Sequence, residues 1–485
     1  MPRRPNILWI MTDEQRADTL GCYGNAWART PNVDRLAAGG VTFDCAIVQN
    51  PVCVPSRVSM LASRYARTVG TMRNIDRLDT RGLVFLPEVL FQAGYETLNI
   101  GRIDCLRGRV DRRRQEGMVG FYGGHMGKAR RPALSTFRPE LTGPERAQAL
   151  GVTWPPADRE VGARTRERVM LYGTYPGPVA DTLEAIHTDM AIDYLQTRTD
   201  DRPFFLRVSH LSPHTPVLPP APFDRLYTPD QARVADPPAE ALARKSSAER
   251  AHRDLFHLDR ASEDVRARYR AHYYGLAAHV DGQVGRLLDA LRDLGLEQDT
   301  VVVYNTDHGS MVGQMGGLVT KGPFDYDHTN RVPLLLSWPG TLPAGARVAD
   351  PVEMVDLYPT LLGLAGVDAP SGLHGMDLGP VVRGRAPGRD AAFSEGGDGN
   401  PDRPDSPGMR YTVRTRTHKL TAYPALGQGV LYDLAADPQE IDNRFDDPAL
   451  AEVRAALLGR ILDWLEQYPG KDWCTDRAGV ARLAG

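Results

Sequence analysis

The chain has 485 residues, of which 42% are hydrophobic and 25% are charged, and its formal net charge is −3. These values are typical of a soluble globular protein, either of about three domains or of one large α/β domain with a smaller one. The small net charge argues against a general nucleic-acid or polyanion binder and leaves a local basic pocket open.

The cysteines and the apolar runs indicate the cellular compartment in which the protein is located. Five cysteines are spaced irregularly, at Cys22, Cys45, Cys53, Cys105 and Cys474. An odd, irregular set is a poor disulfide framework and fits a reducing compartment. The first apolar run breaks at Thr12 and is too short for a signal peptide, and no run approaches the roughly 20 apolar residues that span a bilayer. We therefore expect a cytoplasmic protein with no membrane segment; the alternative is an exported form that lacks its leader.

Alternation of apolar runs and helical patterns predicts the fold class. Dense apolar runs predict buried strands at 6–12, 96–101, 203–209, 300–306 and 332–338. Helical patterns follow at 179–198, 264–295 and 353–366. This order predicts an α/β fold with a mostly parallel central sheet and helices on both faces.

Composition changes suggest the domain boundaries. Residues 215–262 are rich in Pro, Ala and Arg and are expected to be irregular. Residues 384–409 are dense in Gly, Pro and Asp and are expected to be a linker or long loop. We therefore predict a catalytic domain at 1–383 and a small α+β subdomain at 410–485, with a helix at about 448–467.

Acidic and histidine residues follow the predicted strands. Asp13 and Glu14 end the first strand, and Asp307 and His308 follow the strand at 300–306. His210 and His214 follow the strand at 203–209 in the same way. Taken alone, each aspartate is most simply explained as a turn residue, and each histidine as an ordinary loop residue. Together, at the carboxyl ends of separate strands, they are suitable ligands for a divalent cation.

Cys53 lies at the start of a predicted helix. Pro55 suits the first helical turn, and Arg57 lies one turn along. A helix N-terminus and an arginine together favour an anion or a nucleophilic oxygen at this point. A thiol is a poor ligand for a hard cation, which prefers oxygen, although a lone cysteine is more often a small core residue. This mismatch indicates that residue 53 acts in another chemical form.

The sequence resembles the sulfatase family of the alkaline phosphatase superfamily. The motif Cys-x-Pro-Ser-Arg stands at 53–57, and "NILWIMTDEQRADTLGCYG", "TPNVDRLAAGGVTF", "NTDHG", "KGPFDYDHTNRVPLLLSWPG" and "LYDLAADPQEIDN" are further matches. The resemblance covers nearly the whole chain. It implies that Cys53 is oxidised by a formylglycine-generating enzyme to formylglycine, whose hydrated form is the nucleophile.

The resemblance also implies roles for other residues. Asp13, Asp307 and His308 would be metal ligands, with Ca²⁺ as the usual cation and Mn²⁺ or Mg²⁺ as alternatives. Glu14 stands where many relatives have a second aspartate. The remaining expected site residues are Arg57 on the formylglycine oxygen, Lys321 on the bound ester, His214 as acid for the leaving alcohol, and Asn74 in the substrate site.

One segment departs from the family pattern. Sulfatases commonly place Gly-Lys-x-His after the second strand, whereas this chain has Gly101-Arg102-Ile103-Asp104. Arg102 can replace a lysine as an anion contact with different geometry. Asp104 is unfavourable beside a sulfate unless it meets a cation. Asp104 therefore binds either a cationic part of the substrate or Arg102, or else the pocket favours phosphonate monoesters or phosphodiesters.

We predict a hydrolase that cleaves a small-molecule sulfate ester into sulfate and an alcohol. The alternatives are a phosphonate monoester or phosphodiester hydrolase, and a non-catalytic binding protein of the same fold. Among partners, we expect the converting enzyme and no nucleic acid or membrane. Relatives are often dimers or tetramers, so the sequence leaves open whether this chain forms a homo-oligomer.

Overall fold

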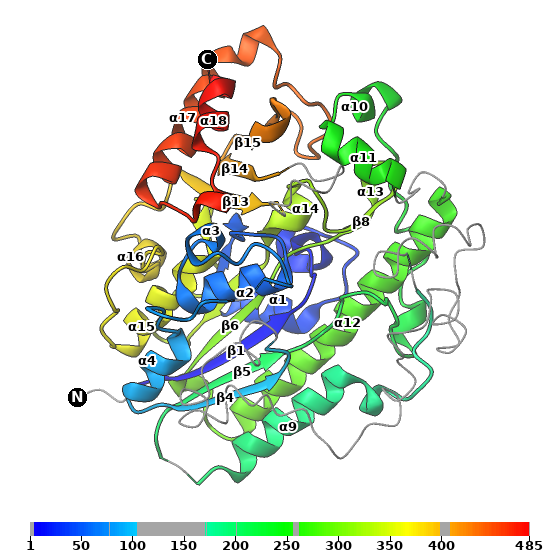
Figure 1. Cartoon of the computed structure of the whole chain (residues 1–485). Helices are drawn as coiled ribbons and strands as arrows, with labels where there is room; N and C mark the ends of the chain where they lie inside the picture. Colours follow the sequence, from blue (N-terminus) through cyan, green and yellow to red (C-terminus); the bar gives the residue numbers. More distant parts are fainter. Residues whose placement is uncertain are drawn as a thin grey trace.

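The computed structural model describes residues 4–76, 78–103, 170, 172–199, 201–255, 261–397 and 408–484. Within these ranges the central sheet has seven strands in the spatial order β11–β2–β10–β6–β1–β5–β4. Their bounds are β1 Asn6–Thr12, β2 Val41–Phe43, β4 Glu96–Gly101, β5 Phe204–Ser209, β6 Thr300–Thr306, β10 Leu334–Ser337 and β11 Ala346–Val348. Figure 1 shows β6, β1, β5 and β4 side by side. Strands β6, β1, β5 and β4 are parallel, and β10 is antiparallel to both of its neighbours.

The helices have the following bounds: α1 Pro31–Ala38, α2 Cys53–Ala62, α3 Ala66–Val69, α4 Leu86–Gln92, α9 Leu183–Thr197, α10 Ala239–Ala243, α11 Ser247–Leu255, α12 Glu263–Asp293, α13 Gln314–Gly317, α14 Asp327–Asn330, α15 Leu357–Ala365, α16 Gly379–Val382, α17 Ala451–Gln467 and α18 Arg477–Ala484. Short strands form two small sheets, β12–β3–β9 and β7–β8: β3 Ala46–Ile47, β7 Met311–Gly313, β8 Leu318–Thr320, β9 Arg331–Val332 and β12 Val352–Glu353.

Both faces of the central sheet are buried, which explains the continuous apolar runs. Trp9 and its alternate neighbours in β1 pack with α2, α4 and α15, whereas Leu8 and Ile10 pack with α1, α9 and α12. Successive side chains of a strand point to opposite faces, so a strand covered on both sides must be apolar at every position. Figure 1 shows α15 and α4 on one side of the sheet and α12 and α9 on the other.

The predicted fold class and most predicted elements are confirmed. The five strand runs correspond to β1, β4, β5, β6 and β10, and the helical patterns correspond to α9, α12 and α15. The stretch 215–262, which was expected to be irregular, instead contains the short helices α10 and α11. Its many prolines do not prevent helix formation because they lie outside the two helical segments.

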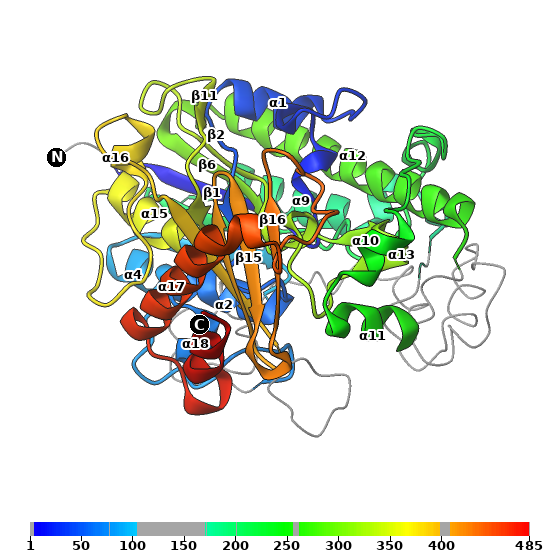
Figure 2. The same cartoon turned by 90° about the horizontal axis from the view of Figure 1, so that it is seen from above.

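A second, antiparallel sheet, β13–β14–β15–β16, follows the central one, with α17 and α18 packed on one side (Figure 2). Its bounds are β13 Ala391–Gly396, β14 Arg410–Thr415, β15 His418–Tyr423 and β16 Gln428–Asp433. The predicted linker at 384–409 therefore includes β13, which hydrogen-bonds along its length with β14. The division into domains at 1–383 and 410–485 stays a prediction.

A buried ion pair joins this sheet to helix α3. Arg67 of α3 donates through Nη1 to Glu395 of β13 at 2.9 Å, and both side chains are fully buried. The guanidinium also lies over the Trp464 ring, 3.7 Å from its centroid, and donates to two carbonyls at the end of α17.

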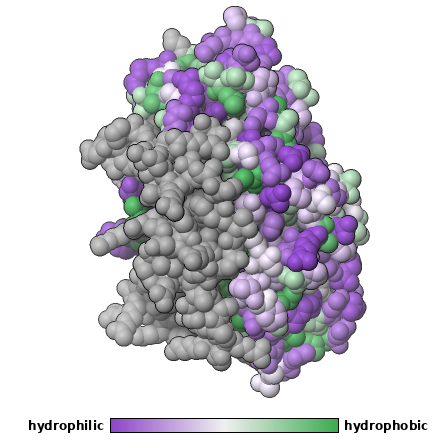
Figure 3. Space-filling view, turned by 90° about the vertical axis from the view of Figure 1, so that its right-hand side faces the viewer, coloured by the Kyte–Doolittle hydropathy of each residue, from purple (hydrophilic) through white to green (hydrophobic). Residues whose placement is uncertain are grey.

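On the coloured part of the face in Figure 3, hydrophilic residues predominate and apolar residues are scattered among them. None of the helices in the described ranges combines the length and apolarity that a membrane crossing needs.

The first prediction concerns the buried ion pair. We expect Arg67→Ala to lower the free energy of unfolding by about 3–5 kcal/mol, because Glu395 is left as an unpaired buried charge. Urea unfolding followed by circular dichroism measures the change. Arg81→Ala is the matched control, since its pair with Asp79 is exposed and should contribute nothing measurable. Equal effects of the two substitutions would contradict the assignment.

Candidate active site

Four buried side chains from three elements converge at one end of the central sheet. Asp13 follows β1, Asp307 and His308 follow β6, and Cys53 is the first residue of α2. Each contributes one potential ligand atom, and these atoms all lie within 4.8 Å of one another. Since β1 and β6 are parallel neighbours, their carboxyl ends place the acidic residues at the same edge.

The start of α2 is held by contacts that set the position of Cys53. Asn74 Oδ1 accepts a hydrogen bond from the Val54 amide at 3.0 Å, which satisfies one of the open donors of the first turn. Ser56 Oγ donates to the Asp307 carbonyl at 2.5 Å. Asn74 thus contacts the first turn of α2 in the structure, while the substrate contact expected for it stays a prediction.

The Cys53 sulfur faces charged groups. Its Sγ lies 3.3 Å from Lys321 Nζ and 3.3 Å from His308 Nε2. Burial raises the pKa of the Cys53 thiol, but nearby positive charge, that of Lys321 above all, outweighs burial and lowers it to about 6. The site is therefore built to hold negative charge at residue 53.

Arg57 links the two aspartates. Its Nη2 donates to Asp13 Oδ2 at 2.8 Å and its Nε to Asp307 Oδ2 at 2.8 Å, with all three side chains fully buried. Arg102 adds a third charged contact, from Nη1 to Asp13 Oδ2 at 2.8 Å. The guanidinium of Arg57 thus orients the carboxylates, and its predicted contact with the nucleophile oxygen stays a prediction. Asp104 lies outside the described residues.

The donors at the cluster fit a divalent cation. His308 Nδ1 lies 2.7 Å from the Gly309 carbonyl, which only accepts, so Nδ1 carries the proton and Nε2 presents its lone pair to the cluster. Asp13 Oδ1 lies 3.9 Å from Cys53 Sγ, on the side of the carboxylate not used by Arg57. A set of two carboxylates and one imidazole can bind Ca²⁺, Mn²⁺ or Mg²⁺, and it is less selective among them than a site made only of oxygen ligands. The ligand set therefore does not identify the metal.

Gly309 is required by close packing at this point. A Cβ added there would lie 2.0 Å from the His328 carbonyl oxygen. The motif Asp307-His308-Gly309 therefore needs glycine at its third position so that the chain can turn back against the segment at 328.

Glu14 forms an ion pair that the sequence did not reveal. Its Oε1 lies 2.5 Å from Lys321 Nζ and 3.7 Å from His214 Nε2. Burial raises the pKa of Glu14, but Lys321 and His214 outweigh burial and lower it to about 2. Glu14 also has a positive φ of 62°, a conformation that costs a non-glycine residue about 1–3 kcal/mol.

His214 reaches the site from the loop after β5. Its Nδ1 lies 2.6 Å from the Thr215 carbonyl, so this nitrogen carries a proton and Nε2 faces Glu14. Burial lowers the pKa of His214, but Glu14 and Asp13 raise it to about 9. These two carboxylates therefore favour the protonated form of His214.

The structure brings together eight of the ten residues expected at the site: Asp13, Cys53, Arg57, Arg102, His214, Asp307, His308 and Lys321. Sequence reasoning missed Glu184, a buried residue of α9 whose Oε1 accepts from the Ser212 amide at 3.0 Å in the His214 loop. Glutamate in an amphipathic helix gives no such signal, because it usually faces solvent.

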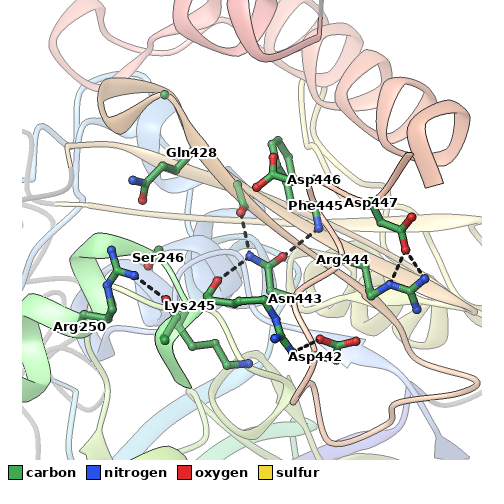
Figure 4. Close-up of a pocket in the computed structure, with 14 residues that line it drawn as sticks. Lys245, Ser246, Arg250, Gln428, Asp442, Asn443, Arg444, Phe445, Asp446 and Asp447 are labelled. Carbon is green, nitrogen blue, oxygen red and sulfur yellow. Dashed lines mark hydrogen bonds and ion pairs between the residues drawn. The ribbon is translucent and has the colours of Figure 1, made fainter. Parts of the chain in front are cut away.

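A separate pocket of about 570 Å³ lies between the α10–α11 segment and the chain around β16 (Figure 4). Two ion pairs lie among its lining residues, Arg244 with Asp442 and Arg444 with Asp447. None of its lining residues belongs to the Asp13–Cys53–Asp307–His308 cluster.

Comparisons with known proteins agree with this geometry. The family model described as "Sulfatase" matches residues 5–367, and "N-sulphoglucosamine sulphohydrolase, C-terminal" matches residues 319–467. An arylsulfatase of Clostridium perfringens is 27% identical, with 97% of this chain and 95% of the relative covered. An N-acetylglucosamine-6-O-sulfatase of Bacteroides thetaiotaomicron is also 27% identical, with 97% and 88% covered.

Among solved structures, the phosphonate monoester hydrolase of Agrobacterium radiobacter is 27% identical and superposes with a TM-score of 0.76, with 96% of each chain covered. The family match over most of the chain and the buried Asp/Cys/Asp/His cluster thus lead to one conclusion: the chain belongs to the sulfatase family of the alkaline phosphatase superfamily.

Proposed function

We propose that this sulfatase-family hydrolase cleaves a sulfate monoester into sulfate and an alcohol, with an oxygen nucleophile derived from Cys53. The observation that carries the proposal is the convergence of Cys53 with Asp13, Asp307 and His308 within 4.8 Å. The names of relatives support sulfate as the group removed, since they include an arylsulfatase and an iduronate 2-sulfatase. A cytoplasmic location and the need for a formylglycine-generating enzyme are part of the same proposal.

Asp13, Asp307 and His308 would hold the divalent cation, for which Ca²⁺ is our first choice. When bound, the cation supplies positive charge that favours a deprotonated hydroxyl on hydrated formylglycine 53 and draws charge from the ester oxygens. Arg57 keeps both carboxylates oriented through Oδ2, which leaves Asp13 Oδ1 on the side of Cys53. Asp307 Oδ1 is oriented further by the amides of Glu14 and His308, which donate to it.

Lys321 and His214 have complementary tasks around residue 53. Lys321 Nζ is 3.3 Å from Cys53 Sγ, where its charge stabilises negative ester oxygens as the S–O bond to the alcohol breaks. His214 gives its Nε2 proton to the departing alcohol oxygen. Its Nδ1 hydrogen bond to the Thr215 carbonyl keeps Nε2 directed into the site during this transfer.

A second candidate function is hydrolysis of a phosphonate monoester or phosphodiester. Arg102 favours it, because its guanidinium is bound to Asp13 where sulfatases commonly have a lysine for the sulfate group. A structural neighbour at 27% identity is a phosphonate monoester hydrolase. These esters carry the same single negative charge as a sulfate monoester, so total charge does not separate them.

The second prediction separates the two activities. Protein made with the converting enzyme should weigh about 18 Da less than the thiol form, and it should turn over 4-nitrophenyl sulfate faster than bis(4-nitrophenyl) phosphate or 4-nitrophenyl phenylphosphonate. Cys53→Ser should lower kcat by about 10³-fold or more, because serine cannot form an aldehyde. Intact mass and steady-state kinetics measure both effects. Higher kcat/KM on a phosphorus ester would replace the sulfatase proposal with the second candidate.

The third prediction concerns pH. The acid form of His214 is the active one, so kcat/KM should fall as pH rises through the pKa of His214, which is about 9 without a cation and lower with one. In His214→Asn this alkaline limb should disappear and kcat should fall by about 10²-fold. pH–rate profiles of both proteins test this, and an unchanged alkaline limb in the variant would remove His214 from the role of acid.

The fourth prediction concerns the metal and needs no substrate. Adding Ca²⁺ to chelator-treated protein should raise the melting temperature, because only the folded chain brings Asp13, Asp307 and His308 together and a ligand that binds only the folded state stabilises it. Differential scanning fluorimetry measures the shift. Asp307→Asn should abolish it, whereas Asp281→Asn, in a buried carboxylate that accepts from the Val33 amide, should leave it intact. A full shift in Asp307→Asn would place the cation elsewhere.

A further inference from the structure

A cluster of buried polar side chains lies behind the active site. Glu184 and His187 come from α9, His210 follows β5, and His279 comes from α12; none is more than 6% exposed. Their ligand atoms do not converge closely enough to form a second metal cluster among the described residues. The cluster therefore requires an explanation other than metal binding.

Glu184 is connected to the active site through the backbone of Ser212. The Ser212 amide donates to Glu184 Oε1 at 3.0 Å, and the Ser212 carbonyl accepts from the Asp13 amide at 3.5 Å. Two residues further along the loop is His214, whose own amide donates to the Leu211 carbonyl at 3.1 Å. The Glu184 carboxylate is thus the side-chain anchor of the turn that carries His214.

The surroundings keep Glu184 ionised. Burial raises the pKa of Glu184, but His279 and His210 lower it below its usual value. Thr182 Oγ1 donates to the Val179 carbonyl at 2.7 Å, so His279 Nε2, 3.1 Å away, donates to that hydroxyl. A carboxylate that accepts from an amide forms a shorter and stronger hydrogen bond than a neutral acceptor does.

The same cluster packs against the strand that carries Arg102. The His187 and His210 rings stack with centroids 6.4 Å apart. A Cβ added at Gly101 would lie 2.9 Å from His187 Nδ1 and 2.2 Å from the Ser209 carbonyl oxygen. Gly101 and the histidines therefore fit together so tightly that a shift of the cluster would move the ends of β4 and β5.

We propose that Glu184 is a positioning residue for the reaction, which it serves by fixing Ser212 and hence the direction in which His214 delivers its proton. This inference rests on the proposed function. A positioning role for the acid has a specific consequence: its loss slows esters whose leaving group needs a proton, and spares esters whose leaving group is stable as an anion.

The experiment compares phenyl and 4-nitrophenyl esters of sulfate and of phenylphosphonate on converted, metal-loaded enzyme. In Glu184→Leu and Glu184→Ala we expect kcat for the phenyl ester to fall by about 10- to 100-fold, and kcat for the 4-nitrophenyl ester to change by less than about threefold. Glu184→Gln keeps an oxygen acceptor for the Ser212 amide and should restore the wild-type ratio of the two rates. Two truncations are used so that one that fails to fold does not end the test.

Asp281→Leu is the matched control. Asp281 is also a buried carboxylate that accepts a backbone amide, from Val33 at 2.8 Å, but it has no contact with the His214 loop. Asp281→Leu should change kcat for the phenyl ester and kcat for the 4-nitrophenyl ester by the same factor. The same uniform loss in the Glu184 variants would overturn the proposal, since it would indicate a general effect on folding.

A crystal structure of Glu184→Leu provides a readout that does not depend on activity. The His214 ring should be displaced from its position beside Glu14, and an unmoved ring would overturn the proposal. If the wild-type enzyme hydrolyses none of these esters, the proposed function fails, and the position of His214 in the variant still decides whether Glu184 fixes it.

Discussion

The bidentate contact of Arg57 with Asp13 and Asp307 is the interaction on which the active site depends. The two carboxylates come from the ends of adjacent strands and would repel each other in a fully buried setting. One guanidinium, delivered by the first turns of α2, offsets both charges and ties this helix to β1 and β6. The same helix begins with Cys53, so the contact that neutralises the carboxylates also places the reacting residue beside them.

Charge balance extends from this contact to the rest of the site. Arg102 forms a second ion pair with Asp13, and Lys321 forms one with Glu14. The carboxylates of Asp13, Glu14 and Asp307 are therefore matched by three positively charged side chains, those of Arg57, Arg102 and Lys321. Buried charges are stable only when paired and hydrogen-bonded. The divalent cation proposed for this site would give it an excess of positive charge, which would be complementary to an anionic ester. Protonated His214 adds to this excess at the point where an alcohol would leave.

The C-terminal sheet contributes to this arrangement indirectly. Arg67 of α3 is held by Glu395 and by the Trp464 ring, and α3 follows α2 after a three-residue connection. A ring contact and a buried ion pair at this point fix the end of α2 that lies opposite to Cys53. The antiparallel sheet and its helices thus support the catalytic helix although none of the cluster residues lies in them.

The sequence by itself determined five of the seven described strands of the central sheet, the helices α9, α12 and α15, and the identity of the clustered residues. Strands buried on both faces must be apolar throughout, and this pattern is visible without a structure; the Cys53–Arg57 motif and Asp307-His308-Gly309 are equally local. Strand β13 was missed because Gly, Pro and Asp on both sides of it dominate the composition of 384–409.

Only the tertiary structure decided which charges meet. Glu14 pairs with Lys321 across 307 positions of sequence, and Glu184 reaches Ser212 from a different element. Ion pairs and buried hydrogen bonds of this kind depend on the relative placement of elements, and no periodicity records them. Local patterns therefore defined the elements and the chemically active residues, while the fold assigned each buried charge its partner.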